Sequence, residues 1–452
     1  MNPVRASLAR TAGRATLALL LAGCGSWSRV GSHPQPDEGQ TLAQILDATA
    51  TYKRLGRLAA GAPIPFVGSV SFLAGAGDST LAILALSLEN SHLAFHREGG
   101  EFVARYRVQF TAEGAERRAE RSREQVVRVA TFQETQRAEE SVLYQDAVAL
   151  PPGRVRVTVT LTDLSNRKSS TVSGEYEVPA FGPGTFSAPV LAYQVRGRAA
   201  RTEPLSLIVN PRGTVAYGRD TALAYVEGYL LPGPRAIPIR LVDARDSVIL
   251  SDTLHFQGRR EVESLVLRFR PETAPLGELR ILAGEGPEQR ATSALVSFSP
   301  NWVVTNFDEM LSLLRYFPSS AVLDSLRKAP PGERARLWSA FWRESDPNPA
   351  SPENEALAEY FSRLALANAR FRDEGVPGWR TDRGEVLIRL GEPDEIFDAS
   401  PQSQGRLIRW GYTRYQLYLF FVDETGFGRY RLTPASRSEF ERVMARVSRQ
   451  AE

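Results

Sequence analysis

The regular alternation of apolar and polar residues is the feature that most constrains how this chain folds. Every second position of one segment is apolar, at Phe102, Ala104, Tyr106, Val108 and Phe110. Arginine and glutamine occupy most of the positions between them. Successive side chains of a β-strand point to opposite faces, so this pattern predicts a strand with one buried and one solvated face.

Runs of this kind fill two long segments, 63–181 and 186–299, with turn-forming residues between them. Several short alternating strands separated by turns are typical of a sandwich. The sequence therefore predicts two antiparallel β-sandwich (Ig-like) domains, joined by the Gly- and Pro-containing stretch 181–184.

The apolar spacing becomes helical after residue 301. Met310, Leu311 and Leu314 fall on one helical face, and a second stripe comprises Leu357, Tyr360, Phe361 and Leu364. The final hundred residues alternate again and then close with an amphipathic helix. Residues 301–452 are therefore predicted to form an α+β domain, with helices packed on a small antiparallel sheet.

Four strands are expected in that sheet, the last at Tyr430 and Leu432 after a turn over 423–426. The first takes in Val386, Ile388 and Leu390, and the second runs over 408–412. The third, over 415–422, is apolar at adjacent positions, so we expect it to be central and covered on both faces.

The first 23 residues have the character of an export signal. They carry three arginines and no acidic residue, followed by a short apolar run. The sequence Leu21-Ala22-Gly23-Cys24 resembles the bacterial lipobox. The resemblance implies a signal peptide over 1–23, cleavage between Gly23 and Cys24, and a lipid on the thiol of Cys24 that anchors the chain to a membrane.

Residues 24–62 are interpreted as a lipidated tether that ends in a short helix near 41–59. Gly25 and Ser26 follow the cysteine, in place of the aspartate that retains lipoproteins at the inner membrane of well-studied Gram-negative bacteria. We therefore expect a lipid-anchored protein of the cell envelope, at the outer membrane, facing the periplasm or the exterior.

Charge gives little support to a nucleic-acid partner. The chain has 55 basic and 52 acidic residues, and three of the arginines lie in 1–23. The remainder is balanced, at 52 against 52. A balanced chain lacks the basic excess that binds phosphate backbones, so we expect no nucleic-acid partner.

One motif near the C-terminus identifies a family. The sequence Gly378-Trp379-Arg380-Thr381-Asp382, followed by a stretch that ends Gly-Glu-Pro-Asp at 391–394, resembles the signature of the GWxTD-domain family. The resemblance covers about residues 301–440. It implies no established activity, cofactor or catalytic residue.

The motif has two interpretations. In the structural one, Gly378 permits an unusual backbone angle, Trp379 plugs the gap between helices and sheet, and Gly384 completes a turn into the following strand. In the functional one, the polar side chains of Asp382, Arg383, Asp394 and Arg409 converge as a recognition site. The site residues under either interpretation are Gly378, Trp379, Thr381, Asp382, Arg383, Gly384, Pro393, Asp394 and Trp410.

Patterns that carry chemistry are sparse. The four histidines, of which His92 and His96 are four residues apart, lack the zinc-protease pattern, and no nucleophile elbow or phosphate-binding loop is present. Asp220 and Glu227 form a weak carboxylate pair that we interpret as solvated strand charges. We expect no catalytic residue, no metal and no cofactor.

These observations favour a membrane-anchored envelope lipoprotein that binds or assembles with another envelope protein. Two alternatives stay open. One is a structural spacer in the envelope. The other is a hydrolase or accessory factor that acts on envelope polymers, with its site near the Gly378–Asp382 turn.

Overall fold

The computed structural model describes residues 48–451, except 116, 136–139, 219–220, 271–273, 300–302, 305, 319, 351–353, 372–375, 399–405 and 427. The predicted signal peptide, Cys24, the tether and Asp220 therefore lie outside the described residues. The described part begins with α2 (Thr49–Arg54), which falls within the predicted short helix.

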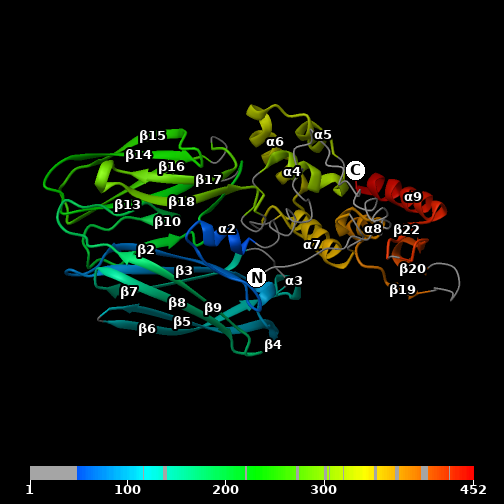
Figure 1. The fold of residues 1–452 in the computed structure, drawn as a ribbon, viewed down its shortest axis with the longest axis horizontal. Helices are drawn as coiled ribbons and strands as arrows, with labels where there is room; N and C mark the ends of the chain where they lie inside the picture. Colours follow the sequence, from blue (N-terminus) through cyan, green and yellow to red (C-terminus); the bar gives the residue numbers. More distant parts are fainter. Residues whose placement is uncertain are drawn as a thin grey trace, which may run out of the picture. The chain divides into compact units, whose positions relative to one another are not determined.

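The first sandwich consists of two sheets that face each other across a common core (Figure 1). One sheet has the order β1-β2-β3-β7, with bounds Leu58–Ala60, Phe66–Ala74, Thr80–Glu89 and Glu140–Leu150. The other has the order β4-β5-β8-β9, with bounds His96–Glu98, Glu101–Gly114, Gly153–Asp163 and Ser169–Val178. The remaining strand β6 (Arg118–Val129) pairs with β5, and the short helices η1 (Asn90–His92) and α3 (Phe132–Thr135) lie in the connections.

The second sandwich also has two sheets. The first has the order β11-β10-β13-β16, with bounds Ser206–Val209, Val190–Arg196, Ala222–Tyr229 and Val262–Phe269. The second has the order β12-β18-β17-β14-β15, with bounds Thr214–Ala216, Arg290–Ser297, Gly277–Ala283, Arg235–Asp243 and Val248–Phe256. The short helix η3 (Gly286–Glu288) joins β17 to β18. The pairing of β12 with β18 is parallel, so this sandwich is not antiparallel throughout as predicted.

Strand β5 shows why the alternation predicts strands correctly. Tyr106, Val108 and Phe110 face the core and are at most 3 % exposed. Arg105 and Arg107 point to the other face, where they form ion pairs with carboxylates of neighbouring strands. The period of two therefore separates core side chains from solvated charges, as expected for half-buried strands.

The two sandwiches pack against each other through an apolar interface. Strand β3 is buried along nearly its whole length, because Ile83 and Ala85 face the second sandwich while its other face fills the first core. Their partners include Val190 and Val209 of the second sandwich.

A buried ion pair lies in the same junction. Both oxygens of Glu227 accept hydrogen bonds from Arg198, at 2.8 and 2.9 Å, and the side chains are 0 and 2 % exposed. The hydroxyls of Tyr225 and Tyr229 also donate to this carboxylate. Two of these side chains also bind Ala74 of the first sandwich. Arg198 Nη2 donates to the carbonyl oxygen of Ala74, and the N–H of Ala74 donates to the hydroxyl of Tyr229.

The interpretation of Glu227 as a solvated strand charge is therefore wrong. An alternating strand has a solvated face only where nothing packs on it, and this face of β13 is covered by the first sandwich. Burying a carboxylate requires such a complete set of donors, because an unpaired charge in the interior is very costly.

The C-terminal region combines helices with a small sheet. The helices are α4 (Phe307–Leu313), η4 (Leu314–Tyr316), α5 (Ala321–Arg327), η5 (Pro331–Glu333), α6 (Arg334–Ser345), α7 (Glu355–Arg370), η6 (Gly378–Arg380), α8 (Asp382–Leu390), η7 (Thr413–Tyr415) and α9 (Pro434–Ala451). The sheet has the order β19-β20-β21-β22, with bounds Glu395–Asp398, Arg406–Tyr412, Leu417–Asp423 and Arg431–Leu432, and all its pairs are antiparallel. This is the predicted α+β arrangement.

One predicted strand is a helix. The alternation of Val386, Ile388 and Leu390 suggested a strand, but these residues lie in α8. Leu387, which a strand would turn to the opposite face, is buried as well. An apolar helix buried on most sides has the same local composition as a buried strand, and the cap at Thr381 favours the helix.

Strand β21 is covered on one face only, which also differs from the prediction. Leu417, Leu419 and Phe421 are buried, whereas Tyr418 and Phe420 are 51 and 38 % exposed. Aromatic residues suit a pleated strand on either face, so an apolar strand sequence does not by itself show that both faces are covered.

The apolar core of the second sandwich continues into the helices. Phe298 packs edge-on against Trp338 of α6 at 4.6 Å between ring centroids. A single cluster of buried side chains extends from Phe186 through these two residues to Phe440 of α9. The helices therefore complete the end of the second sandwich instead of forming a separate core.

Replacing Arg198 with methionine tests the buried pair in the junction. The change leaves the Glu227 carboxylate buried without its cation, so we expect the free energy of unfolding to fall by about 3–5 kcal/mol. Arg198→Met combined with Glu227→Leu should recover much of this loss. Chemical denaturation of the three proteins measures the effect.

The exposed pair of Arg156 and Glu175, with side chains 62 and 77 % exposed, provides the control. Arg156→Met should leave stability nearly unchanged. Equal effects of Arg198→Met and Arg156→Met would contradict the role assigned to the buried pair.

Candidate functional site

The second half of the Gly378–Asp382 motif starts helix α8. Thr381 is the N-cap, and its hydroxyl oxygen accepts a hydrogen bond from the N–H of Gly384 at 3.0 Å. The same hydroxyl donates to the carbonyl oxygen of Gly378 at 2.8 Å. An N-cap of this kind stabilises a helix by about 1 kcal/mol, and here it also closes the motif onto itself.

Trp379 is a plug in the interior, as the structural interpretation predicts. Its side chain is 1 % exposed and meets the ring of Tyr316 edge-on. The guanidinium of Arg380 lies over the indole, 4.8 Å from the ring centre. The indole is therefore not part of the floor of an open pocket.

The two glycines of the motif allow the backbone to pack closely. A Cβ on Gly378 would lie against the carbonyl oxygens of Phe371 and Ala367, and one on Gly384 would lie against the carbonyl oxygen of Gly378. Neither glycine has a positive φ. The expectation that Gly378 adopts an unusual backbone angle is wrong, and close approach is the reason that glycine occurs there. Gly384 likewise belongs to the first turn of α8, not to a turn into a strand.

Asp382 joins three elements of the C-terminal region. Its carboxylate accepts a hydrogen bond from the N–H of Leu432 in β22 at 2.8 Å. It also pairs with Arg437 of α9 at 2.9 Å and with Arg431 at 3.6 Å, and its side chain is 17 % exposed. Arg437 binds Glu385 of α8 as well, at 2.8 Å. Burial lowers the pKa of Arg437, but the two carboxylates outweigh burial and raise it overall.

Arg383 has aromatic partners. Its guanidinium lies over the rings of Phe371 and Tyr430, at 4.8 and 4.3 Å from their centres. It also donates to the carbonyl oxygen of Gly428 at 3.5 Å. These cation–π contacts hold the loop before β22 against the end of α7.

The Gly-Glu-Pro-Asp turn connects α8 to the sheet. The carboxylate of Asp394 accepts a hydrogen bond from the N–H of Thr413 at 2.6 Å, and its own N–H donates to Gly411 at 2.9 Å. Pro393 is half-buried in the same turn. Asp394 thus holds together the start of β19 and the end of β20.

Trp410 lies on the inner face of β20. It is 3 % exposed and packs at a tilt against Phe371 and Phe421, with centroids 5.6 and 4.8 Å away. It therefore joins the sheet to α7 through the core.

The polar side chains expected to converge bind in different places. Asp382 binds β22 and α9, Asp394 caps a turn, and Arg383 lies over buried rings. Arg409 lies on the outer face of the sheet, over Phe397. The functional interpretation of the motif as one recognition site is therefore not supported, because these side chains come from α8, the turn after it and β20, and they bind separate neighbours.

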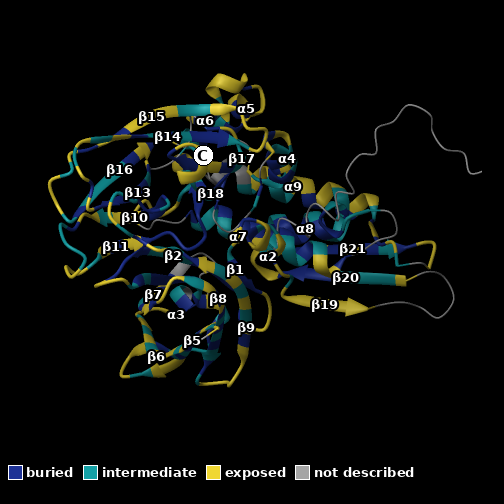
Figure 2. Cartoon of the chain, turned by 60° about the vertical axis from the view of Figure 1, so that its left-hand side comes forward, coloured by how far each residue is buried: buried dark blue, intermediate teal, exposed yellow. Residues whose placement is uncertain are grey.

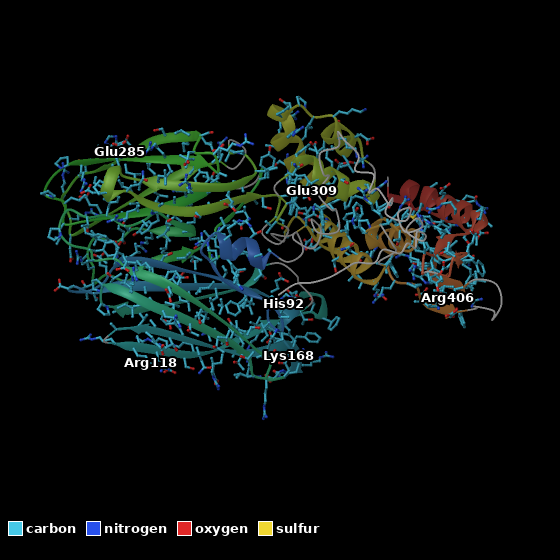
Figure 3. All side chains as sticks on the ribbon, in the orientation of Figure 1. His92, Arg118, Lys168, Glu285, Glu309 and Arg406 are labelled. Atoms are coloured by element: carbon cyan, nitrogen blue, oxygen red, sulfur yellow. The ribbon has the colours of Figure 1, made fainter. Side chains whose placement is uncertain are left out.

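The residues singled out for chemistry elsewhere have ordinary environments. His92, at the end of η1, lies 3.5 Å from Glu89, and burial lowers its pKa. His96 binds Glu98 of the same strand at 2.7 Å, and His92 is labelled in Figure 3. Within the described residues, no group of three or more His, Cys, Asp or Glu side chains is arranged to hold a metal. None of the described helices is long and apolar enough to cross a membrane.

The sequence analysis missed an exposed aromatic surface on the C-terminal sheet. Phe397 of β19, Arg409 of β20, and Tyr418 and Phe420 of β21 lie on the same side, opposite the packed helices. The three aromatic side chains are 50, 51 and 38 % exposed in sequence order. We call these four residues the outer face. The sequence signal that could have found it is the pair of aromatic residues Tyr418 and Phe420, which alternate along β21 with residues that are buried.

Comparison with known proteins identifies the C-terminal region. Residues 284–433 match the family model of the GWxTD domain. The match starts at the end of β17, before the predicted boundary at 301, which agrees with the core shared by the second sandwich and the helices. No curated protein matches the chain.

Two solved structures align with about half of the chain at low similarity. The crystal structure of dimeric latent PorU from Porphyromonas gingivalis aligns with 54 % of this chain at 10 % identity and a TM-score of 0.24. The FN1–FN3 domains of chicken CNTN1 align with 50 % at 12 % identity and a TM-score of 0.14. The alignments span 21 % of the PorU chain and 66 % of the CNTN1 chain. At these scores neither likeness carries an argument about this chain.

Alanine at position 378 tests the close packing of the motif. The added methyl group has to displace backbone atoms of α7, so we expect a loss of about 1–3 kcal/mol or more in the free energy of unfolding. Gly332→Ala is the control, because a Cβ there meets open space. Urea denaturation of both variants measures the difference, and a neutral Gly378→Ala would refute the explanation.

Replacing Asp382 with asparagine tests its role as a connector. The amide keeps an acceptor for Leu432 but loses the charge that pairs with Arg437, so we expect a loss of about 1–3 kcal/mol. Asp324→Asn removes an exposed i,i+3 pair with Arg327 and should change stability by less than about 0.5 kcal/mol. Similar losses in the two variants, measured by the midpoint of urea unfolding, would count against this role.

Proposed function

We propose that this chain, whose residues 284–433 form a GWxTD domain, is a lipid-anchored lipoprotein of the bacterial cell envelope that binds another envelope protein. The two sandwiches carry the domain away from the membrane, and its binding surface is the outer face. The anchor is at the outer membrane.

The sequence supports the anchor. The residues before Cys24 fit an export signal that ends in a lipobox, and Cys24 is the only cysteine of the chain. Each buried methylene group of an acyl chain contributes about 0.8 kcal/mol, so the two or three chains of a lipoprotein hold it firmly.

The outer face is the observation that carries the binding function. Three aromatic side chains and an arginine lie side by side on one face of the sheet, and Trp410, Leu419 and Phe421 are buried on the other face. Contiguous exposed apolar surface on a folded protein marks an interaction site. Tyrosine and arginine are also enriched among the residues that dominate binding energy at protein interfaces.

A hydrolytic function near the motif has less support. A glycosidase-like mechanism needs two carboxyl groups on opposite sides of a substrate. Asp382 and Glu385, the acidic residues of the motif region, both pair with Arg437 of α9. Their charges stabilise the fold.

The spacer function has one observation in its favour. The apolar junction and the buried pair of Arg198 and Glu227 join the two sandwiches, and joined sandwiches suit a rigid support. A spacer, however, does not require an exposed aromatic face.

Replacing Cys24 with serine tests the anchor. The variant lacks the thiol that accepts the diacylglyceryl group, so we expect the protein to leave the membrane fraction and the detergent phase in Triton X-114 partition. Ser26→Ala, two residues further on, is the matched control and should stay lipidated. Mass spectrometry that finds an unmodified thiol at position 24 of the mature protein would overturn the proposal.

Gentle chemical crosslinking in intact cells tests the binding function. We expect a covalent complex that contains a second envelope protein. Recovery of the chain without a partner from crosslinked envelopes would instead favour the spacer function.

A further inference from the structure

The outer face has a chemistry specific enough to describe its partner. We infer that it binds an extended, apolar segment of a partner protein and that a carboxylate of this segment pairs with Arg409. The inference rests on the proposed binding function and adds the chemistry of the partner.

Arg409 lies at the centre of the outer face. In the sheet register it is directly opposite Phe397 on one side and Phe420 on the other. Its guanidinium lies 4.2 Å from the ring centre of Phe397 and 5.1 Å from that of Tyr418. The two rings hold the planar group in place, which lowers the conformational entropy that binding would otherwise cost.

The sheet also positions the ring of Tyr418. Gly411 faces Tyr418 across the β20–β21 pair, and a Cβ at this glycine would lie 3.1 Å from the tyrosine ring. The ring therefore lies over the backbone of β20, next to Arg409. An aromatic residue that covers a glycine in this way is a known device for fixing a sheet surface.

The guanidinium keeps most of its hydrogen-bonding capacity. Its one ion-pair partner in the described part of the chain is Glu395, at 4.0 Å, the outer limit of such a contact. Its Nε is buried and has no hydrogen-bond partner. A guanidinium has five N–H donors arranged to match a carboxylate. Here they lie among aromatic rings, where a charge-assisted bond is stronger than in water.

The strand beside Arg409 favours an extended partner. Strand β19 is at the edge of the sheet and is exposed at every residue (Figure 2). It carries Ile396, which is 60 % exposed, next to Phe397. Edge strands of this composition are sites where another chain adds. A segment that lies along β19 brings its side chains over Phe397 and within reach of Arg409.

A membrane surface fits the outer face less well. Binding to anionic lipid uses several cations that project from the surface, whereas Arg409 is the one cation among the four residues of the outer face and lies against two rings. The cation that the register places on the same side in β22, Arg431, pairs with Asp382. One carboxylate of β19, Glu395, lies on the same face, opposite Gly411. A protein segment with apolar residues and one acidic residue satisfies both the rings and the guanidinium.

Site-specific photo-crosslinking in cells tests this inference. One variant of the full-length chain carries p-benzoylphenylalanine in place of Tyr418. A second variant, the control, carries it in place of Phe132, an aromatic residue of the first sandwich that is 64 % exposed. We expect an adduct at position 418 and none at 132. Mass spectrometry should map the adduct to a segment of another protein with apolar residues and an Asp or Glu.

The mapped segment then serves as a synthetic peptide for binding to the unlipidated Cys24→Ser chain. We expect Arg409→Gln, or the peptide with its acid replaced by the amide, to weaken binding about tenfold or more. Arg409→Lys should recover only part, because lysine lacks the planar fork of donors. Circular dichroism verifies the fold of each variant.

Each other result overturns the inference. An adduct at 132 with none at 418 leaves the binding function intact and removes the outer face as its site. A segment without an acidic residue, or an adduct with a second copy of this chain, excludes the stated partner. Flotation of the unlipidated chain with phosphatidylethanolamine and phosphatidylglycerol vesicles, lost in Phe420→Ser, assigns the outer face to lipid. No adduct at either position, together with no complex in chemical crosslinking, rejects the binding function as well.

Discussion

The carboxylate of Glu227 sets the relation between the two sandwiches. It is completely buried and receives four hydrogen bonds, two from Arg198 and one each from Tyr225 and Tyr229. Two of these donors also bind the backbone of Ala74 in the first sandwich. Removing water from this charge costs a large free energy unless all the donors are in place. The polar network therefore requires the two sandwiches to pack in one arrangement. The helices then build on the far end of the second sandwich through Phe298 and Trp338.

The motif near the C-terminus likewise joins separate elements of the fold through a few inward contacts. Trp379 fills the core, Thr381 caps α8, and Asp382 connects α8 to β22 and α9. The hydroxyl of Thr381 and the carboxylate of Asp382 both bind other parts of the domain. The function that we propose therefore falls on a surface outside the motif, where aromatic side chains and a held arginine remain exposed. In this domain the motif residues stabilise the fold, and the outer face stays exposed and able to bind a partner.

Local sequence patterns predicted most helices and strands correctly. They predicted less well which faces of those elements are buried and which are exposed. The alternation in β5 and the helical stripe of α7 both correspond to the observed elements. The run at 386–390 is a helix, because a short, mostly apolar stretch fits either period and the cap at Thr381 favours the helix. The exposure of Tyr418 and the burial of Glu227 both depended on what packs against a strand face, which the strand's own sequence does not contain.

The sequence by itself determined the two β segments, the helical region with its small sheet and the family of the C-terminal domain, because period, turn residues and short motifs are local properties. The lipid anchor stays a prediction. Only the tertiary structure decided which charges are buried, why Gly378 and Gly384 are glycines, and which face of the C-terminal sheet stays open. These features arise from contacts between residues far apart in the chain. Arg198 and Ala74 are 124 positions apart, and the choice of such a partner is made by the whole fold.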